Sequence, residues 1–263
     1  MNFSPIVLQG FDGRESSLGG IKRYVHHITP VMLYRTNDLI HSKRVLWHLE
    51  EALPDIVSVY GDQFNVDFAR TLALVHDDVE ILSGDVQLVE KENMKQEELK
   101  ALERKEQEFI PTIVSMYNPV ANGFSYAELL AAAKEKKRIE AQFVSFFDKF
   151  DGSGEALHEL WAGNHHFLGP AGGDSGRETG YVKRLNDFPT KYPVMKEFFQ
   201  RFPHYLPEPF DFKLVAEKGI PHTEESLWCD SGYQPYERWK KTIMKREGNE
   251  LLITRLEFPE KKI

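Results

Sequence analysis

The sequence predicts a mainly α-helical fold, because apolar residues recur at helical spacing between residues that commonly start and stop helices. The clearest run steps by four, three, four and three residues and comprises Phe68, Leu72, Val75, Val79 and Leu82. Strand-like alternation is confined to the segment from Leu252 to Phe258. We therefore expect an all-α helical bundle followed by a C-terminal extension of mixed, partly irregular structure.

The first two predicted helices have clear start and stop signals. One begins with Asn37 or Asp38 as its cap and ends at Pro54, since proline removes a backbone donor and clashes with the preceding turn. The other begins after Asn65 and continues to Gly84, a residue type that commonly ends helices. The first carries a histidine in its first turn, and the second carries several acidic side chains near its end.

The later helices are predicted from residue composition and from capping patterns. Residues 95–117 are rich in Glu, Lys and Gln and predict a solvated helix that Pro111 kinks or ends. The spacing of Ser125 and Glu128 is that of a capping box, which predicts a long helix to about Phe150. A separate short helix is expected from Glu155 to about Trp161.

The character of the chain changes after residue 168. The stretch at 169–176 is rich in glycine and predicts a loop or linker, so we divide the chain into domains at 1–168 and 169–263. The first begins with an irregular arm. Within the second, a helix is expected at 194–201 and a strand near 252–258.

Composition and charge exclude several classes of protein. The 263 residues include 33 Lys and Arg against 41 Asp and Glu, a net charge of −8, which argues against a general nucleic-acid-binding coat. The single cysteine, Cys229, forms neither an intrachain disulfide nor a cysteine-rich zinc site. No apolar run approaches membrane-spanning length. We expect a cytoplasmic protein with no membrane partner.

The richest chemical signal is the string from His76 to Asp85, which places ionisable side chains on an otherwise apolar helix and at its end. Burying several carboxylates without a counter-charge costs several kcal/mol each, a cost that a divalent cation removes. His76 and Asp77 differ by about 100° around a helix, close enough to bind one ion. Glu80 lies one turn after His76 on the same side, where it can handle the proton of a water molecule without being a ligand.

Two residues rarely saturate a divalent ion, so further ligands are expected from other helices. His41 and Asp148 are the natural candidates, with Asp151 as an alternative to Asp148. A mixed His and Asp set suits one divalent ion of Mn, Co, Zn, Ni, Fe or Mg, among which the sequence does not choose. Such an ion polarises a phosphoryl oxygen and acidifies water, which favours hydrolysis of a phosphate ester.

These residues resemble a known family. The order His41, His76-Asp77, Asp148 is similar to the H…HD…D signature of the HD superfamily of metal-dependent phosphohydrolases. The fuller pattern with Glu80, Gly84 and Asp85 resembles the 5'-deoxynucleotidase (YfbR-like) branch. In that branch an Ala-Gly-Asn turn follows the fourth ligand by sixteen residues, as Asn164 follows Asp148 here. The resemblance covers roughly residues 20–168.

The resemblance implies a role for each matching residue. His41, His76, Asp77 and Asp148 would hold the metal. Glu80 would act on the attacking water or the leaving group, and Asp85 would contact the sugar or support the site. An arginine next to an aromatic residue holds the phosphate and reads the deoxyribose in this branch. Arg23-Tyr24 resembles that pair, with Tyr in place of the usual Trp, and Arg35 is the competing phosphate ligand.

The function expected from these patterns is hydrolysis of (deoxy)nucleoside 5'-monophosphates to nucleoside and phosphate, with a nucleotide as the small-molecule partner. An HD hydrolase of deoxynucleoside triphosphates or cyclic phosphodiesters is the alternative within the enzyme class. A catalytically silent nucleotide-binding protein is the alternative outside it. The family also implies a homodimer.

Several aromatic and histidine residues are left without an assigned role. Trp228, Tyr233 and Trp239 of the extension are a lid, a dimer contact or ordinary core. The pairs His26-His27 and His165-His166 lack carboxylates at matching spacing, so we interpret them as loop or surface histidines.

Overall fold

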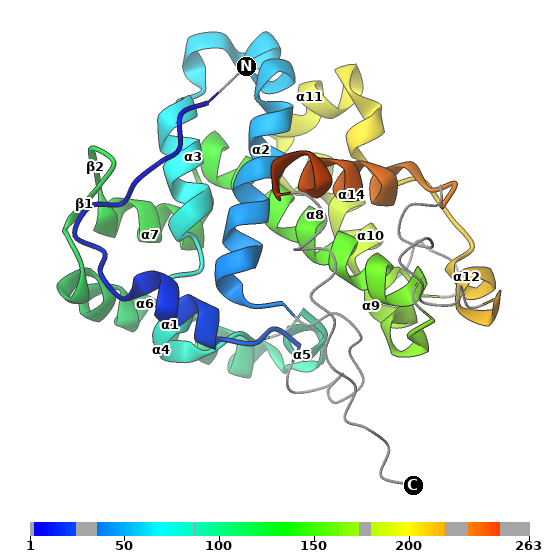
Figure 1. Cartoon of the computed structure of the whole chain (residues 1–263), viewed down its shortest axis with the longest axis horizontal. Helices are drawn as coiled ribbons and strands as arrows, with labels where there is room; N and C mark the ends of the chain where they lie inside the picture. Colours follow the sequence, from blue (N-terminus) through cyan, green and yellow to red (C-terminus); the bar gives the residue numbers. More distant parts are fainter. Residues whose placement is uncertain are drawn as a thin grey trace, which may run out of the picture.

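The computed structural model describes residues 3–24, 36–86, 88–161, 163–173, 180–218 and 231–247. Helices dominate these residues, which confirms the predicted all-α fold (Figure 1). The α-helices are α1 (Arg14–Gly20), α2 (Asp38–Tyr60), α3 (Val66–Val75), α4 (Glu80–Ser83), α5 (Leu88–Asn93), α6 (Gln96–Met116), α7 (Tyr126–Glu135), α8 (Ile139–Trp161), α9 (Leu168–Ala171), α10 (Gly180–Lys191), α11 (Lys196–Arg201), α12 (Phe212–Lys218) and α14 (Gln234–Glu247). Single 3₁₀ turns are η1 (Gly61–Gln63), η2 (His165–Phe167), η3 (Pro193–Met195) and η4 (Pro203–Tyr205). A small antiparallel pair, β1 (Val120–Ala121) and β2 (Phe124–Ser125), precedes α7.

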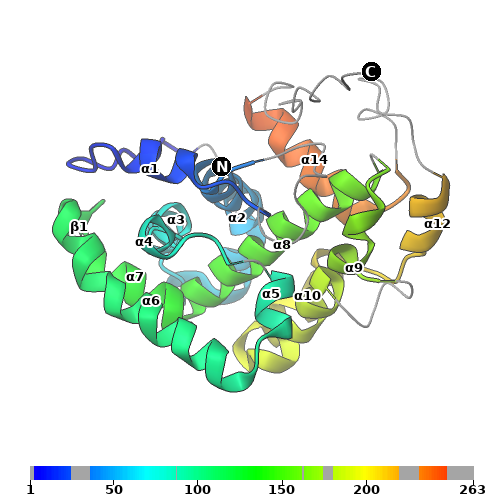
Figure 2. The same ribbon diagram turned by 90° about the horizontal axis from the view of Figure 1, so that it is seen from below.

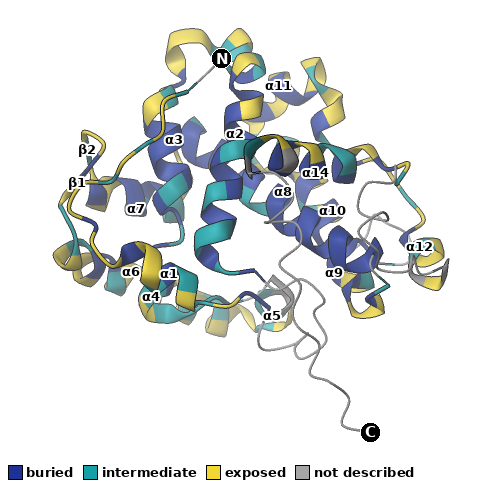
Figure 3. Ribbon diagram, viewed as in Figure 1, coloured by how far each residue is buried: buried dark blue, intermediate teal, exposed yellow. Residues whose placement is uncertain are grey.

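The centre of the fold is helix α8, which packs against α2, α3, α10 and α14 (Figures 1 and 2). Almost every side chain of α8 is buried, and Figure 3 shows the helix almost wholly in the colour of buried residues. A helix that is covered on all sides belongs to the interior of a bundle. The residues of α8 that are only partly buried are Ile139, Asp148 and Lys149. The last two face the cavity described below.

Helix α2 begins as predicted but does not end at Pro54. The Asn37 side chain accepts a hydrogen bond from the backbone N–H of Ile40 at 3.0 Å, which caps the helix. The helix then continues through Pro54 to Tyr60. An interior proline costs about 3 kcal/mol. Buried Leu53 and Ile56 on either side of it offset this cost by packing in the core.

The predicted second helix is also shorter than expected. Helix α3 ends at Val75, residues 76–79 form turns, and the short helix α4 follows. Buried Asp78 fixes these turns, because its carboxylate accepts hydrogen bonds from Arg14 Nε at 2.7 Å and from the Tyr126 hydroxyl at 2.6 Å. Gly84 then adopts a φ of 73° after α4, as expected for a helix stop.

The long helix predicted after Ser125 is two helices. The chain leaves α7 at Lys136, whose φ of 52° is left-handed, and α8 begins at Ile139. The short helix predicted from Glu155 is the continuation of α8, so Asp148 lies in the middle of a helix rather than near its end. Gly152 and Gly154 do not interrupt α8. Rings from other helices fill the space beside them: a Cβ on Gly152 would lie 2.7 Å from Tyr181, and one on Gly154 would lie 2.1 Å from Trp239.

Helices beyond residue 168 share the core formed by the earlier ones. Helix α10 packs on α8, α11 packs on α2, and α14 contacts both α2 and α8 (Figure 1). The helix expected at 194–201 is present as η3 and α11. The strand expected near 252–258 lies outside the described residues, as do Trp228, Cys229 and the pair His26-His27. Among the described helices, none combines the length and the hydropathy needed to cross a membrane.

Candidate metal centre

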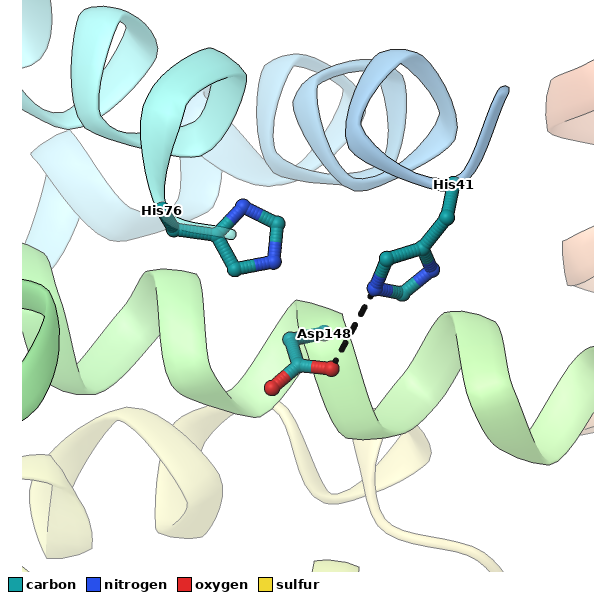
Figure 4. Close-up of side chains that lie close together, drawn as sticks. All are labelled: His41, His76 and Asp148. Carbon is teal, nitrogen blue, oxygen red and sulfur yellow. Dashed lines mark ion pairs between the residues drawn. The ribbon is translucent and has the colours of Figure 1, made fainter. Parts of the chain in front are cut away.

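Three of the predicted ligands meet at the junction of three helices. His41 extends from the first turn of α2, His76 follows the end of α3, and Asp148 points from the middle of α8 (Figure 4). One ligand atom of each lies within 4.8 Å of the other two, a separation that one ion can bridge. His41 Nε2 is 3.4 Å from Asp148 Oδ1.

Asp77, the fourth predicted ligand, joins the same cluster. Its Oδ2 lies 3.1 Å from His76 Nε2 and 3.5 Å from His41 Nε2. Burial alone would raise the pKa of Asp77, but the adjacent imidazoles of His76 and His41 bring it below its usual range. The four side chains predicted from the sequence therefore lie together.

Each of the two histidines presents its Nε2 atom to this cluster. His76 Nδ1 lies 2.9 Å from the carbonyl oxygen of Ala73, which leaves Nε2 for a ligand. The Nε2 atoms of His41 and His76 are buried, and neither makes a hydrogen bond of good geometry with any residue that the structure describes. Burial and Arg23 lower the pKa of His41, but Asp148 and Asp151 outweigh them and raise it to about 9. The site favours positive charge, and its donor set of imidazole and carboxylate fits a divalent transition metal.

Asp151, the alternative to Asp148, faces the opposite nitrogen of His41. Asp151 Oδ2 is 2.8 Å from His41 Nδ1. A second group of possible ligands, His41, Asp151 and Glu155, lies close enough for an ion. The guanidinium of Arg44 contacts the carboxylates of both Asp151 and Glu155. Arg23 Nε also lies 2.9 Å from Glu155. The charges of Asp151 and Glu155 are therefore already neutralised by arginine side chains. For this reason Asp148 fits the role of metal ligand better than Asp151 does.

Glu80 and Asp85 line the cavity beside the cluster. Glu80 begins α4, and its Oε2 is buried without a hydrogen-bond partner among the described residues. Burial and the negative charges of Asp77, Asp85 and Asp38 raise the pKa of Glu80 well above its usual value. A carboxyl group in such surroundings readily holds a proton. Asp85 follows Gly84 and is half-buried.

Arg23 and Tyr24 also line the cavity, but both are buried and have partners in the protein. Arg23 pairs with Glu155 and lies 3.7 Å from Asp38. The Tyr24 hydroxyl is 3.0 Å from that of Tyr181, and its backbone is held at a φ of 57°. Arg35, the competing phosphate ligand, lies outside the described residues.

Asp38 is a member of the site that sequence reasoning missed. It is fully buried three residues before His41, and burial together with Asp85 and Asp77 raises its pKa to about 8 in spite of Arg23. The spacing of three residues places Asp38 on the same helix face as His41, so the sequence did contain a signal from which Asp38 could have been predicted as a site residue.

A second group of residues that sequence reasoning missed forms one wall of the cavity. We call Lys136, Lys149 and Lys191 the lysine wall; they come from the α7–α8 connection, α8 and the end of α10, and all line a cavity of about 480 Å³. Burial and the charges of Lys149, Lys191 and Lys134 lower the pKa of Lys136 to about 8. Because these lysines are far apart in the chain, no local pattern could have joined them.

His165 and His166 are exposed, as expected for surface histidines, and lie in η2. Asn164 caps that turn, since its side-chain oxygen accepts from the backbone N–H of His166 at 3.3 Å. Its amide also donates to Glu159 at 2.8 Å. The described contacts of Asn164 are thus those of a residue that shapes the turn after α8.

Comparisons with known proteins agree with this geometry. A sequence model of the family described as 5'-deoxynucleotidase YfbR-like matches residues 26–187. Among solved structures, a conserved hypothetical protein from Pyrococcus furiosus is similar, with 17% sequence identity and a TM-score of 0.50 over 78% of this chain and 96% of that chain. At that identity the likeness shows the fold alone. No curated protein matches the sequence.

Proposed function

The chain belongs to the YfbR-like 5'-deoxynucleotidase family, and on that basis we propose that it hydrolyses (deoxy)nucleoside 5'-monophosphates to nucleoside and phosphate with one divalent metal ion. The observation that supports the proposal is that two imidazole Nε2 atoms, neither with a hydrogen-bond partner among the described residues, meet two carboxylates beside a cavity that His76, Asp77 and Asp148 line. Family membership supports a metal-dependent nucleotide phosphohydrolase of the HD type. The monophosphate substrate and the residue roles below are our proposal.

His41, His76, Asp77 and Asp148 would hold the ion. When bound, it supplies Lewis-acid polarisation of a phosphoryl oxygen and a source of acidity for the attacking water. Glu80 lies beside the cluster, where its Oε2 has no partner in the described part of the chain, and exchanges a proton with the attacking water or the leaving oxygen. Burial and the neighbouring acids raise the pKa of Glu80, so its carboxyl group holds a proton more readily than a solvent-exposed one does.

The substrate phosphate and sugar are assigned to the other cavity residues. We assign Asp85 to contact with the sugar. Tyr24 and Arg23 would contact the nucleotide on the side of the cavity nearest α8. Arg23 is buried and pairs with Glu155 and Asp38, whereas the members of the lysine wall are only partly buried or exposed, so we assign the larger part of phosphate binding to the lysine wall. Lys149 lies directly beside the metal cluster, with Nζ 2.7 Å from Asp148 Oδ2. Ammonium groups near a phosphate stabilise its charge at the reacting centre.

Phosphate release from a substrate panel tests the proposed function. The panel contains deoxynucleoside and ribonucleoside monophosphates, deoxynucleoside triphosphates and cyclic dinucleotides, and the chelated protein is reloaded separately with Mn, Co, Mg or Zn. We expect orthophosphate from the deoxynucleoside monophosphates. Binding of these nucleotides with no orthophosphate, tripolyphosphate or linear nucleotide formed from any panel member would contradict an enzymatic role and favour a nucleotide-binding protein.

A second substrate class has support from one feature of the cavity. The lysine wall offers three ammonium groups, and a chain of phosphates can contact more of them than a single phosphate can, which favours a deoxynucleoside triphosphate as the alternative. The same panel distinguishes the two classes, because a triphosphate cut at the sugar releases tripolyphosphate in place of orthophosphate.

The pH dependence of substrate binding tests the lysine wall. Below a pKa of about 8 the Lys136 ammonium is charged and attracts phosphate, and above it the charge is lost. We expect the KM for a monophosphate to rise by about fivefold between pH 7 and pH 9, equivalent to about 1 kcal/mol for one charge near the surface. Steady-state kinetics across this range measure the change.

Lys136→Arg is the matched variant for this test, because a guanidinium stays charged throughout the range. Its KM should stay nearly constant where that of the wild type rises. If both proteins showed the same rise, the assignment of Lys136 to phosphate binding would be wrong.

A further inference from the structure

The second nitrogen of His41 is held by a buried carboxylate. His41 Nδ1 lies 2.8 Å from Asp151 Oδ2, and both side chains are fully buried. When Nδ1 donates its hydrogen to a carboxylate, Nε2 is left with its lone pair free, the form in which imidazole binds a metal. Asp151 therefore selects the tautomer and the ring orientation that the metal centre needs.

A residue from the C-terminal helix holds that carboxylate in turn. Trp239 of α14 donates its indole N–H to Asp151 Oδ1 at 2.7 Å. Arg44 also donates to Asp151, and His48 Nε2 lies 3.4 Å from it. Trp239 is the one of these partners that lies beyond residues 26–187, the segment that matches the family.

The surroundings of Trp239 are shaped for this contact. The indole is 2% exposed and lies against α8 at Gly154, where a Cβ would approach its Cδ1 to 2.1 Å. Glycine inside a helix costs about 1 kcal/mol relative to alanine, so its presence here has a packing reason. The Arg44 guanidinium covers the indole ring at 5.3 Å from its centroid. These contacts fix the position from which the N–H reaches Asp151.

We propose that helix α14 is part of the metal centre, with Trp239 as a positioning residue that acts on His41 through Asp151. The inference rests on the proposed function, because it takes His41 as a metal ligand. This proposal assigns the C-terminal extension a role in metal binding, which is not part of the family signature. If Trp239 served the core alone, its N–H would matter to folding and not to metal affinity.

The test measures divalent-metal affinity on chelated full-length protein by titration calorimetry with Mn and Co, without any substrate. The variants are Asp151→Asn, which keeps the shape of the side chain, and Trp239→Phe, which removes the indole N–H. Tyr236→Phe is the matched control. It removes a hydroxyl of α14 that lies 2.7 Å from His158 Nδ1 on α8, a residue outside the metal cluster. The absorption spectrum of the Co-loaded protein reports the ligand geometry, and thermal unfolding reports the fold.

We expect Asp151→Asn to weaken metal binding by roughly 10- to 100-fold, the usual effect of losing the partner of a ligating histidine. Trp239→Phe should weaken it by a smaller factor, roughly 3- to 10-fold, and change the Co spectrum. Tyr236→Phe should change neither. Equal affinities and spectra for the folded Trp239→Phe and Tyr236→Phe variants would overturn the inference.

If Trp239→Phe does not fold, Trp239 is replaced with β-(3-benzothienyl)alanine, which keeps the ring shape and lacks the N–H. The same loss of affinity then supports the inference, and wild-type affinity overturns it. Failure of the proposed function is a separate result. A chain that binds metal in this way but releases no phosphate from any nucleotide would contradict the function and leave the role of Trp239 supported.

Discussion

Replacement of Asp77 or His76 with alanine is expected to abolish both divalent-metal binding and phosphate release. Each change removes one ligand atom from a four-residue cluster and leaves the remaining groups too few to hold the ion. Lewis-acid stabilisation by a metal is worth several kcal/mol, so the rate should fall by about 10³-fold or more. Metal content after dialysis and orthophosphate release measure the two effects.

Asp67→Ala is the matched control for Asp77→Ala. Asp67 lies in the first turn of α3, the helix that precedes Asp77, and its side chain is 72% exposed. It should retain wild-type metal content and rate. An Asp77→Ala protein that keeps its metal with unchanged affinity would show that the ligand assignment is wrong.

Replacement of Glu80 with alanine or glutamine is expected to leave metal binding intact and to lower kcat by about 10²- to 10⁴-fold, the usual contribution of a general acid or base. Glu80 lines the cavity and belongs to neither group of possible ligands. Glutamine keeps its shape but cannot exchange the proton. The comparison of kcat with metal affinity separates this role from that of a ligand.

Glu103→Gln is the control for Glu80→Gln, because it removes an acidic charge from the same cavity at an exposed position. Its kcat should remain near that of the wild type. Full activity in either Glu80 variant would mean that the proton-transfer role is wrong.

The metal cluster could be predicted from the sequence because its signals are local. His76 and Asp77 are neighbours, and His41 sits in the first turn of a helix whose cap, Asn37, is also visible in the sequence. Asp148 could be chosen over Asp151 by its spacing to Asn164. Residue type and short-range spacing indicated His76 and Asp77, and the family resemblance indicated His41 and Asp148. The structure brings the four side chains together, while their role as ligands stays a prediction.

The features that escaped prediction depend on contacts between distant segments. Pro54 does not end α2 because core packing on both sides of it offsets the lost hydrogen bond. Gly152 and Gly154 continue α8 because Tyr181 and Trp239 fill the space beside them. From the sequence, Asp151 could be considered only as a possible metal ligand. Its role as a partner of His41 was not visible, because the indole and imidazole groups that contact it come from helices remote in the chain. No periodicity encodes such pairs.

The most direct test of the central claim is orthophosphate release from a deoxynucleoside 5'-monophosphate by chelated protein, before and after titration with Mn or Co. The account predicts no release from the chelated protein and release that rises with added metal until one ion per chain is bound. Undiminished release after chelation, or a chain that binds one ion and releases phosphate from no monophosphate, would contradict it.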